Sequence, residues 1–343
     1  MKLSDIDFVL PPELIAQMPA HPRDQAKLMY LDRAQDTLLH KRFFELSSLL
    51  RKGDLLVLNN TKVDKVRLLG KLNGKSGEIF VILHRGDKQY QCLLRPHKAL
   101  KPTDNVFELL ANENVLVFDV MSKESDGSVV IDLAKTPLDI KTILEQCGNT
   151  PFPPYIKADE TLAAEYQTVF AEKSGSLAAP TAGLHFTAPL ISDLREEGVE
   201  IAYLTHHVGL GTFMPIKTES IEEHLMHEES YELSTQTVEA VQQAKQRGNR
   251  IIACGTTVAR CLEGNVATYG SLTATKGTTS IYIYPPYTFQ VIDGLITNFH
   301  LPKSTLLLLV ASLIGVEKLK ECYTLAIEQH YRFFSFGDAM LIL

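Results

Sequence analysis

A run of short β-like segments interrupts a chain whose other parts have the pattern of alternating helices and strands, and this interruption limits the possible architectures. Between residues 66 and 133, apolar alternating segments such as VRLLGKL and EIFVILH are separated by turn sequences such as NGKSG and RGDK. Alternation broken by Gly, Asn and Asp at this spacing predicts an antiparallel sheet or a small barrel.

The segments on both sides of this region have the pattern of an α/β domain. The apolar strand GDLLVLNN precedes it, and two capped helices follow it, TAPLISDLREEG before VEIAYLTHHV and STQTVEAVQQAKQRG before RIIACG. Helices that alternate with apolar strands predict a mainly parallel sheet covered by helices. We therefore expect a discontinuous α/β domain over residues 1–61 and 150–343, with an antiparallel β-barrel domain inserted over residues 62–149.

Composition and cysteine spacing are those of an ordinary globular protein. Of 343 residues, 45% are hydrophobic and 22% are charged, which argues against disorder. The five cysteines are scattered and form no CxxC pair, which predicts reduced thiols in a cytoplasmic protein. The amino-terminal segment lacks the apolar core of a signal peptide. The apolar run STLLLLVASLIGV is shorter than the roughly 20 residues that span a bilayer, so we expect a buried helix.

The net charge of −7 does not indicate a nucleic-acid-binding protein, but the charge is unevenly distributed. Between Thr61 and Lys101, ten Lys or Arg stand against three Asp or Glu, whereas residues 102–150 contain three Lys or Arg and nine acids. The basic segment is compatible with a phosphate-binding face, although solvated lysines would give the same pattern.

Polar residues follow several predicted strands, where chemistry gathers in α/β proteins. Two such exits hold Asn59, Asn60 and Thr61, and Gly255, Thr256 and Thr257. The second exit begins a helix, with Arg260 one turn inward, and a helix start of this kind can bind a carboxylate or a phosphate. A capped helix without a ligand is the commoner alternative.

Five of the eleven histidines lie between His185 and His227, in AAPTAGLHF, THHVGLGTF and HLMHEES, and His300 follows in TNFHLPKST. Histidine titrates near neutrality, so this cluster suits proton transfer or metal binding. His224 and His227 could share a helical face beside Glu228, but neither HExxH nor a thiolate set is present. We prefer proton transfer, with a metal site and purely structural histidines as alternatives.

The carboxyl-terminal stretch YRFFSFGDAMLIL combines an arginine, aromatic rings and an aspartate. Aromatic faces beside a guanidinium suit a planar base or a sulfonium cation. A final core strand would have the same pattern.

Taken in order, these segments resemble the S-adenosylmethionine:tRNA ribosyltransferase-isomerase family of the queuosine pathway. The matching strings are GDLLVLNNTKV, PPYI, EYQTVF, AAPTAGLHF, HVGLGTF, HLMHEE, GTT with Arg260, ITNFHLPKSTLLLLV and YRFFSFGDAM. They cover nearly the whole chain, and PTAGLHF and TNFHLPKST are each long and unusual. This sequence departs from the family pattern at three places. His206 stands where an aliphatic residue is usual, Val258 and Ala259 replace a small polar pair, and Pro286 stands where glycine is usual.

The resemblance implies an α/β domain with an inserted β-barrel and a monomeric or weakly associating enzyme without a metal or prosthetic group. It implies two substrates, S-adenosylmethionine and a tRNA that carries 7-aminomethyl-7-deazaguanine at the wobble position. The implied products are epoxyqueuosine in tRNA, adenine and methionine.

The required chemistry, together with positions in glycine-containing loops after strands, suggests roles for individual residues. We expect His185 or His207 to act as the base, with His300 in reserve. The expected contacts to S-adenosylmethionine are Thr181, Gly183, Gly255, Thr256, Thr257, Arg260, Phe333, Phe334 and Asp338. The expected contacts to tRNA are Asn60, Thr61, Arg67, Lys71, Lys75 and Lys98.

Three other classes of protein remain open. A methyltransferase-like enzyme or binder would also take S-adenosylmethionine, but it would lack the PTAGLHF and TNFHLPKST pairing and would release S-adenosylhomocysteine. A metallohydrolase would use the histidine cluster. A non-catalytic RNA-binding protein is disfavoured by the acidic net charge and by the lack of a recognisable RNA-binding module.

Overall fold

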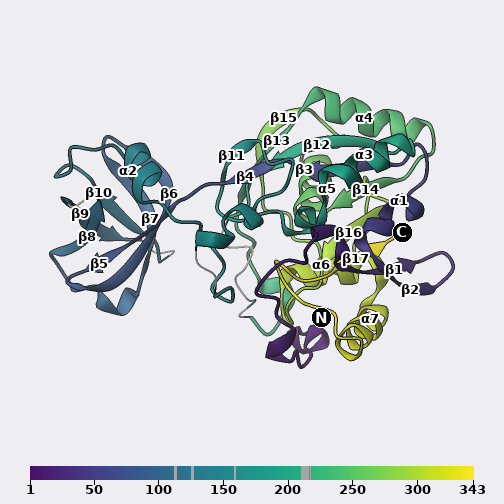
Figure 1. The fold of residues 1–343 in the computed structure, drawn as a ribbon, viewed down its shortest axis with the longest axis horizontal. Coiled ribbons are helices and arrows are strands. Elements are labelled where there is room, and N and C mark those ends of the chain that lie inside the picture. Colours follow the sequence, from purple (N-terminus) through teal and green to yellow (C-terminus); the bar gives the residue numbers. More distant parts are fainter. Residues whose placement is uncertain (112–113, 125–126, 158–159, 210–215, 217) are drawn as a thin grey trace. The chain divides into compact units, whose positions relative to one another are not determined.

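The chain forms two compact units, residues 1–62 with 153–343 and residues 63–152 (Figure 1). This computed structural model describes residues 1–343 except 112–113, 125–126, 158–159, 210–215 and 217. The larger unit has a sheet with helices and the smaller unit is a closed antiparallel barrel, so the predicted fold class is confirmed.

A nine-stranded mixed sheet forms the frame of the larger unit, in the order β15-β13-β12-β3-β14-β16-β17-β1-β2. The strands are β1 (Lys27–Asp32), β2 (Thr37–Arg42), β3 (Leu55–Asn59), β12 (Glu200–His206), β13 (Glu229–Leu233), β14 (Ile251–Cys254), β15 (Thr275–Thr279), β16 (Gly294–Asn298) and β17 (Ala339–Ile342). A separate two-stranded sheet pairs β4 (Thr61–Val63) with β11 (Lys173–Ser176).

Parallel pairing is concentrated at the centre of the large sheet. β12, β3, β14 and β16 are parallel neighbours, and β1 is parallel to β17. The pairs β12–β13, β13–β15, β16–β17 and β1–β2 are antiparallel. The expected parallel sheet is therefore the central part of a mixed sheet, in which antiparallel pairs lie toward both edges.

Helices pack on both faces of the sheet, which explains the continuous apolar run of β3. Leu56 and Leu58 belong to a core with α1 (Leu46–Leu49) and α3 (Ala188–Glu196). Leu55 and Val57 belong to a second core on the opposite face. The helices that contribute to that second core are α4 (Thr235–Gln246), α5 (Thr256–Tyr269), α6 (Thr305–Ile314) and α7 (Val316–Glu328).

Local sequence signals account for several of these helices. The Thr187 side chain accepts a hydrogen bond from the backbone N–H of Leu190 at 3.3 Å, which confirms the predicted start of α3. The apolar run after Ser304 is α6, in which residues 307–311 are buried, as predicted. Within the described part of the chain, no helix combines the length and the apolar character that crossing a bilayer requires.

The smaller unit is a closed barrel of six antiparallel strands in the order β10-β7-β6-β5-β8-β9. Its elements are β5 (Arg67–Leu72), β6 (Lys75–Gly86), β7 (Gln89–Arg95), β8 (Asn105–Ala111), β9 (Asn114–Lys123), β10 (Val129–Asp132) and the helix α2 (Ile140–Cys147). Phe107 and Phe118 are fully buried in its core. A Cβ at Gly70 would lie 2.3 Å from the backbone oxygen of Glu108, so the approach of β5 to β8 requires glycine.

Candidate active site

Four neighbouring parallel strands end at one edge of the large sheet, and three of them end in a polar residue. Asn59 ends β3, His206 ends β12 and Asn298 ends β16, while Gly255 follows β14 directly. Because parallel strands have their carboxyl ends at the same edge, residues far apart in the sequence meet there.

A cavity of about 150 Å³ lies at this edge, within the larger unit. Its polar side chains include Thr256 and Thr257 at the start of α5, and Thr297, Asn298 and His300 at the end of β16. The apolar part of the wall consists of Ala179, Pro180, Ala182, Val208, Leu301, Pro302, Leu306 and Phe334. Among the described residues that line it, none is Asp, Glu, Lys or Arg. The cavity therefore suits a ligand recognised through neutral donors and acceptors.

His300 is the candidate base that lines the cavity. Its side chain is buried, and Nε2 lies 2.7 Å from Oγ1 of Thr297. The backbone N–H of His300 donates a hydrogen bond to the Tyr323 hydroxyl at 3.0 Å. Burial lowers the pKa of His300 to about 3, so the imidazole is neutral near pH 7 and has a lone pair available to accept a proton.

His185 lies behind the cavity wall, at the end of the short 3₁₀ helix Thr181–His185. Its Nε2 is 3.2 Å from Nδ2 of Asn298, and that Nδ2 also donates to the Phe334 carbonyl at 3.1 Å. A carbonyl can only accept, so the Phe334 contact assigns the amide orientation and makes Nε2 of His185 an acceptor. Burial lowers the pKa of His185 to about 4, in agreement with a neutral ring. His185 thus holds Asn298, which does line the cavity.

His207 lies beside the cavity, immediately before the lining residue Val208. Its Nδ1 is 2.7 Å from Oγ1 of Thr61. Gly175 of β11 allows the ring to approach the backbone, because a Cβ at that position would lie 2.9 Å from Cε1 of His207. In the motif HVGLGTF, residues 210–213 lie outside the described residues.

Five of the expected S-adenosylmethionine contacts do line the cavity, namely Thr181, Gly255, Thr256, Thr257 and Phe334. Phe334 has a φ of 73°, an uncommon backbone conformation for a non-glycine residue. Its ring centroid lies 4.1 Å from that of Tyr155, whose hydroxyl is 2.7 Å from Oγ of Ser335. The strained residue therefore presents an aromatic ring to the cavity and a carbonyl to Asn298.

Three other expected S-adenosylmethionine contacts, Gly183, Phe333 and Asp338, do not line the cavity. A Cβ at Gly183 would lie 2.9 Å from the ring of Phe170 and 2.9 Å from the methyl group of Thr168. Phe333 is fully buried in the core. Asp338 accepts hydrogen bonds from the backbone N–H groups of Lys27 at 3.0 Å and Arg332 at 2.7 Å. In this structure these three residues are therefore packed or hydrogen-bonded within the frame around the cavity.

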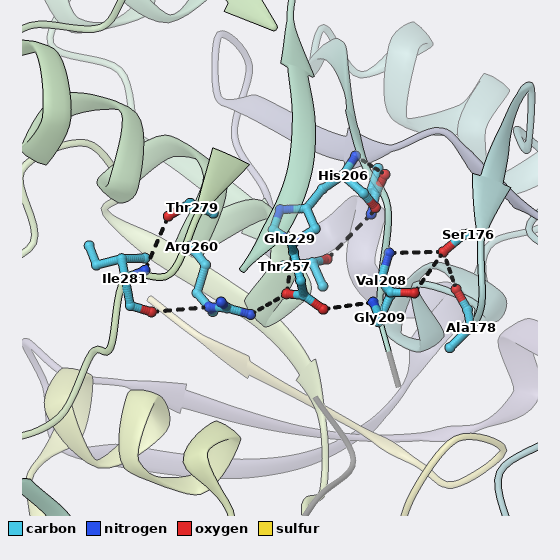
Figure 2. Close-up of polar contacts among 11 residues, drawn as sticks. Ser176, Ala178, His206, Val208, Gly209, Glu229, Thr257, Arg260, Thr279 and Ile281 are labelled. Atoms are coloured by element: carbon cyan, nitrogen blue, oxygen red, sulfur yellow. Dashed lines mark hydrogen bonds and ion pairs between the residues drawn. The ribbon is translucent and has the colours of Figure 1, made fainter. Parts of the chain in front are cut away.

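Arg260 also lies away from the cavity, in a buried network that the sequence did not indicate (Figure 2). Its Nη1 is 2.5 Å from Oε2 of Glu229, and Nε2 of His206 is 3.0 Å from the same oxygen. The other carboxylate oxygen accepts from the backbone N–H of Gly209 at 2.8 Å. Arg260 and Glu229 are 3% and 4% exposed. Glu229 of β13 thus provides the counter-charge for the guanidinium of Arg260, which lies on α5.

The expected tRNA contacts Asn60 and Thr61 lie at the exit of β3. Asn60 accepts a hydrogen bond from the Thr205 hydroxyl at 2.7 Å, and Thr61 contacts His207. In the barrel, Arg67 forms an ion pair with Glu78 at 2.6 Å. Asn60, Thr61 and Arg67 are therefore already engaged by protein groups.

Three expected tRNA contacts, Lys71, Lys75 and Lys98, are exposed around one turn of the barrel. Asn73 and Gly74 form the two-residue connection between β5 and β6, and Asn73 has a φ of 50°, as an Asn-Gly hairpin requires. The Asn73 side chain donates to the Ala99 carbonyl at 3.0 Å, which holds the segment with Lys98 near this turn. We call Lys71, Lys75 and Lys98 the turn lysines.

Tyr155, Thr297, Asn298 and Ser335 line the cavity but were not among the expected site residues. Thr297 and Asn298 belong to the same motif as His300, and Tyr155 lies in PPYI. All three residues therefore stand in motifs that the sequence marks. His224, considered as a metal ligand, has its ring 5.5 Å from that of Tyr282. Over the described residues, no group of three or more His, Cys, Asp or Glu is placed to hold a metal.

The family described as "Queuosine biosynthesis protein" matches residues 3–342. The chain belongs to this family. A relative from Sulfurihydrogenibium sp. (strain YO3AOP1) is 46% identical over 352 residues, and one from Desulfitobacterium hafniense (strain DSM 10664 / DCB-2) is 45% identical over 345, with 100% of both chains covered in each case. Both are named S-adenosylmethionine:tRNA ribosyltransferase-isomerase.

A solved structure extends the comparison to three dimensions. The crystal structure of an S-adenosylmethionine tRNA ribosyltransferase from Thermotoga maritima matches with a TM-score of 0.58 and 37% identity, covering 99% of this chain and 100% of that chain. This likeness places the fold of the large sheet and the inserted barrel within the queuosine biosynthesis family.

Proposed function

We propose that this chain transfers and isomerises the ribosyl part of S-adenosylmethionine onto 7-aminomethyl-7-deazaguanine at the tRNA wobble position. The products are epoxyqueuosine in tRNA, adenine and methionine. The observation that carries this proposal is the full-length identity of 45–46% with relatives named S-adenosylmethionine:tRNA ribosyltransferase-isomerase. The enzyme acts as a cytoplasmic monomer without a prosthetic group, and its five free cysteines agree with a reducing compartment.

The chemistry requires a proton acceptor near the sulfonium. The positive sulfur acidifies the adjacent C5′ hydrogen, and removal of that proton starts ring opening and loss of adenine. The neutral aminomethyl nitrogen of the tRNA base then attacks the ribosyl fragment. An alkoxide displaces methionine and closes the epoxide. Each positioned acid or base in such a sequence contributes roughly 10²–10⁴ in rate.

Geometry favours His300 as the base over His185 and His207. His300 lines the cavity with a neutral imidazole, whereas His185 lies behind the wall and uses Nε2 to hold Asn298. His207 lies beside the cavity with Nδ1 against Thr61. We assign proton abstraction to His300 and positioning roles to His185 and His207.

The remaining cavity residues are assigned to the S-adenosylmethionine contacts. Gly255, Thr256 and Thr257 provide donors at the start of α5, while Thr181 contributes to the polar part of the wall. Phe334 supplies an aromatic face for adenine or for the sulfonium. Gly183, Arg260, Phe333 and Asp338 shape the frame around these contacts.

We assign part of the tRNA interface to the turn lysines, because they gather at one exposed turn of the barrel. Phosphate contacts by Lys release counterions, so binding through them weakens as salt concentration rises. Asn60, Thr61 and Arg67 remain candidate tRNA contacts through a rearrangement of their present hydrogen bonds. The target base leaves its stack to reach the cavity, as enzymes that act on bases generally require.

Reversing the charge of the turn lysines should weaken tRNA binding and flatten its salt dependence. For the triple variant Lys71→Glu, Lys75→Glu and Lys98→Glu, we expect the slope of log affinity against log salt to fall by about one for each phosphate that the variant no longer neutralises. Filter binding or fluorescence anisotropy across a salt series measures this slope. The matched control is Lys135→Glu with Lys141→Glu, two exposed lysines of the same unit. Equal slopes for the triple variant and the wild type would remove this turn from the interface.

Product analysis tests the proposed reaction directly. Purified protein is incubated with S-adenosylmethionine and tRNA that carries the aminomethyl base, and small products are separated by chromatography. We expect adenine and methionine in equal amounts, together with tRNA whose mass increases by the ribosyl addition. Formation of S-adenosylhomocysteine would instead establish a methyltransferase, and absence of both adenine and methionine would overturn the proposal.

A further inference from the structure

The amino end of α5 faces the cavity without a side chain that caps it. Its N-cap is Gly255, with a φ of 94°, and it makes no side-chain hydrogen bond to the helix. The backbone N–H groups of Thr256 and Thr257 donate to no acceptor among the described residues. Free N–H groups and the helix macrodipole, roughly half a positive charge, favour an anion at such an end.

The Thr256 side chain is a second, separate indication of a ligand. The residue is 6% exposed and lines the cavity, and its hydroxyl makes no hydrogen bond with any residue that the structure describes. Thr257 differs, since its hydroxyl lies 3.5 Å from Nδ2 of Asn59. Ser304 at the start of α6 differs as well, because its hydroxyl accepts from the backbone N–H of Leu307 at 3.3 Å. Thr256 is thus a buried residue whose hydroxyl has no described protein partner and lines the cavity, where a ligand oxygen would satisfy it.

The charges around the cavity also favour an anion at this position. No carboxylate is found among the described lining residues, so no negative side chain of the cavity wall would repel a bound anion. Arg260, four residues along α5, cannot supply the counter-charge, because Glu229 holds its guanidinium at 2.5 Å and the residue does not line the cavity. Recognition at this end therefore depends on neutral donors, which bind one carboxylate oxygen each with defined direction.

We propose that the start of α5 binds the α-carboxylate of the amino-acid part of the sulfonium substrate. The Thr256 hydroxyl and the N–H groups of Thr256 and Thr257 are the donors. This assignment rests on the proposed function, since it takes S-adenosylmethionine as the substrate. Released methionine keeps the same carboxylate, so it occupies the same donors and acts as a product inhibitor.

A comparison of two sulfonium substrates tests this subsite. Thr256→Val removes the hydroxyl with little change of shape, and Thr256→Ser retains it. At saturating tRNA, we expect Thr256→Val to lower kcat/KM for S-adenosylmethionine by about 10- to 100-fold, the effect of losing a hydrogen bond to a charged group. The same variant should leave kcat/KM for decarboxylated S-adenosylmethionine nearly unchanged. Thr256→Ser should be close to wild type with both substrates.

The control variant is Thr235→Val, at the exposed first residue of α4, which should behave as wild type. Equal losses with both substrates, or no loss with either, would overturn the carboxylate assignment. Calorimetric binding of the two sulfonium compounds to wild type and Thr256→Val measures the same preference without turnover. If the wild type discriminates by binding but releases neither adenine nor methionine, the proposed reaction fails while the carboxylate subsite stands.

Discussion

The variant His300→Asn should release adenine about 10²–10⁴-fold more slowly than the wild type when both substrates are saturating. Asparagine preserves much of the volume and can keep a hydrogen bond to Thr297, but it cannot accept a proton from carbon. Single-turnover measurement of adenine isolates the chemical steps from product release. The KM values for both substrates should change far less than kcat, because the lost group acts in the transition state.

A matched control and two further variants sharpen this result. His330→Asn changes an exposed histidine with a φ of 52°, a conformation that asparagine tolerates, and its turnover should be unchanged. His207→Asn and His185→Asn should lower turnover less than His300→Asn, since both residues act through neighbours. Near-normal turnover of His300→Asn combined with loss in His207→Asn would transfer the role of base to His207.

The pH dependence of kcat/KM gives an independent test of the same assignment. A base acts in its deprotonated form, and the pKa of His300 is lowered to about 3 by burial. The rate should therefore show no acid limb from this group between pH 8 and pH 5. An acid limb near 6.5, the ordinary histidine value, would identify a histidine without this shift and would contradict the assignment.

Stability sets the lower pH limit of that experiment. The pKa values of His185 and His300 are lowered to about 4 and about 3 in the folded state, so the unfolded chain takes up protons first as pH falls below about 6.5. The contribution of both neutral rings is complete above pH 6.5 and is lost progressively toward pH 4 and 3. Between pH 6.5 and 5, each buried ring lowers the free energy of unfolding by about 2 kcal/mol. The kinetics should therefore be accompanied by a stability measurement.

Patterns with a local physical cause were predicted well from the sequence. The start of α3 at Thr187 follows from one side-chain hydrogen bond, and the position of the barrel follows from alternation interrupted by turn residues. The polar exits at Thr256 and His300 are also predictable, because each lies two residues beyond the end of a buried strand that the sequence marks. In these cases neighbours in the sequence determine the outcome.

Features that depend on distant strands were not predictable in this way. Glu229 begins β13, and the pairing of this strand with β12, which the sequence does not mark, places its carboxylate against Arg260. Phe333 and Phe334 are adjacent, yet Phe333 is buried in the core while Phe334, with a positive φ, lines the cavity. The sequence alone indicates which residue types are present. It does not indicate the long-range contacts that decide whether a side chain is buried in the core or lines the cavity.

Removal of the Glu229 carboxylate should be among the most destabilising single changes in this protein. In Figure 2 the carboxylate joins Arg260, His206 and the N–H of Gly209, the residue that follows Val208 of the cavity wall. Glu229→Ala leaves a guanidinium that is 3% exposed without its counter-charge. We expect a loss of about 3–5 kcal/mol in the free energy of unfolding, measured by chemical denaturation.

The exposed pair Arg247–Glu200 provides a control with the same chemistry. Its atoms are 2.6 Å apart, but the two side chains are 42% and 43% exposed, so Glu200→Ala should cost only about 0–1 kcal/mol. The double variant Glu229→Leu with Arg260→Met removes both buried charges and should recover much of the loss of Glu229→Ala. The losses in the free energy of unfolding of the single variants Glu229→Leu and Arg260→Met are measured as well. If the loss of the double variant equalled the sum of these two losses, the two charges would not be coupled. The stabilisation by these residues would then come from packing. For a coupled buried ion pair, removal of one partner lowers the free energy of unfolding more than removal of both, because it leaves one buried charge uncompensated.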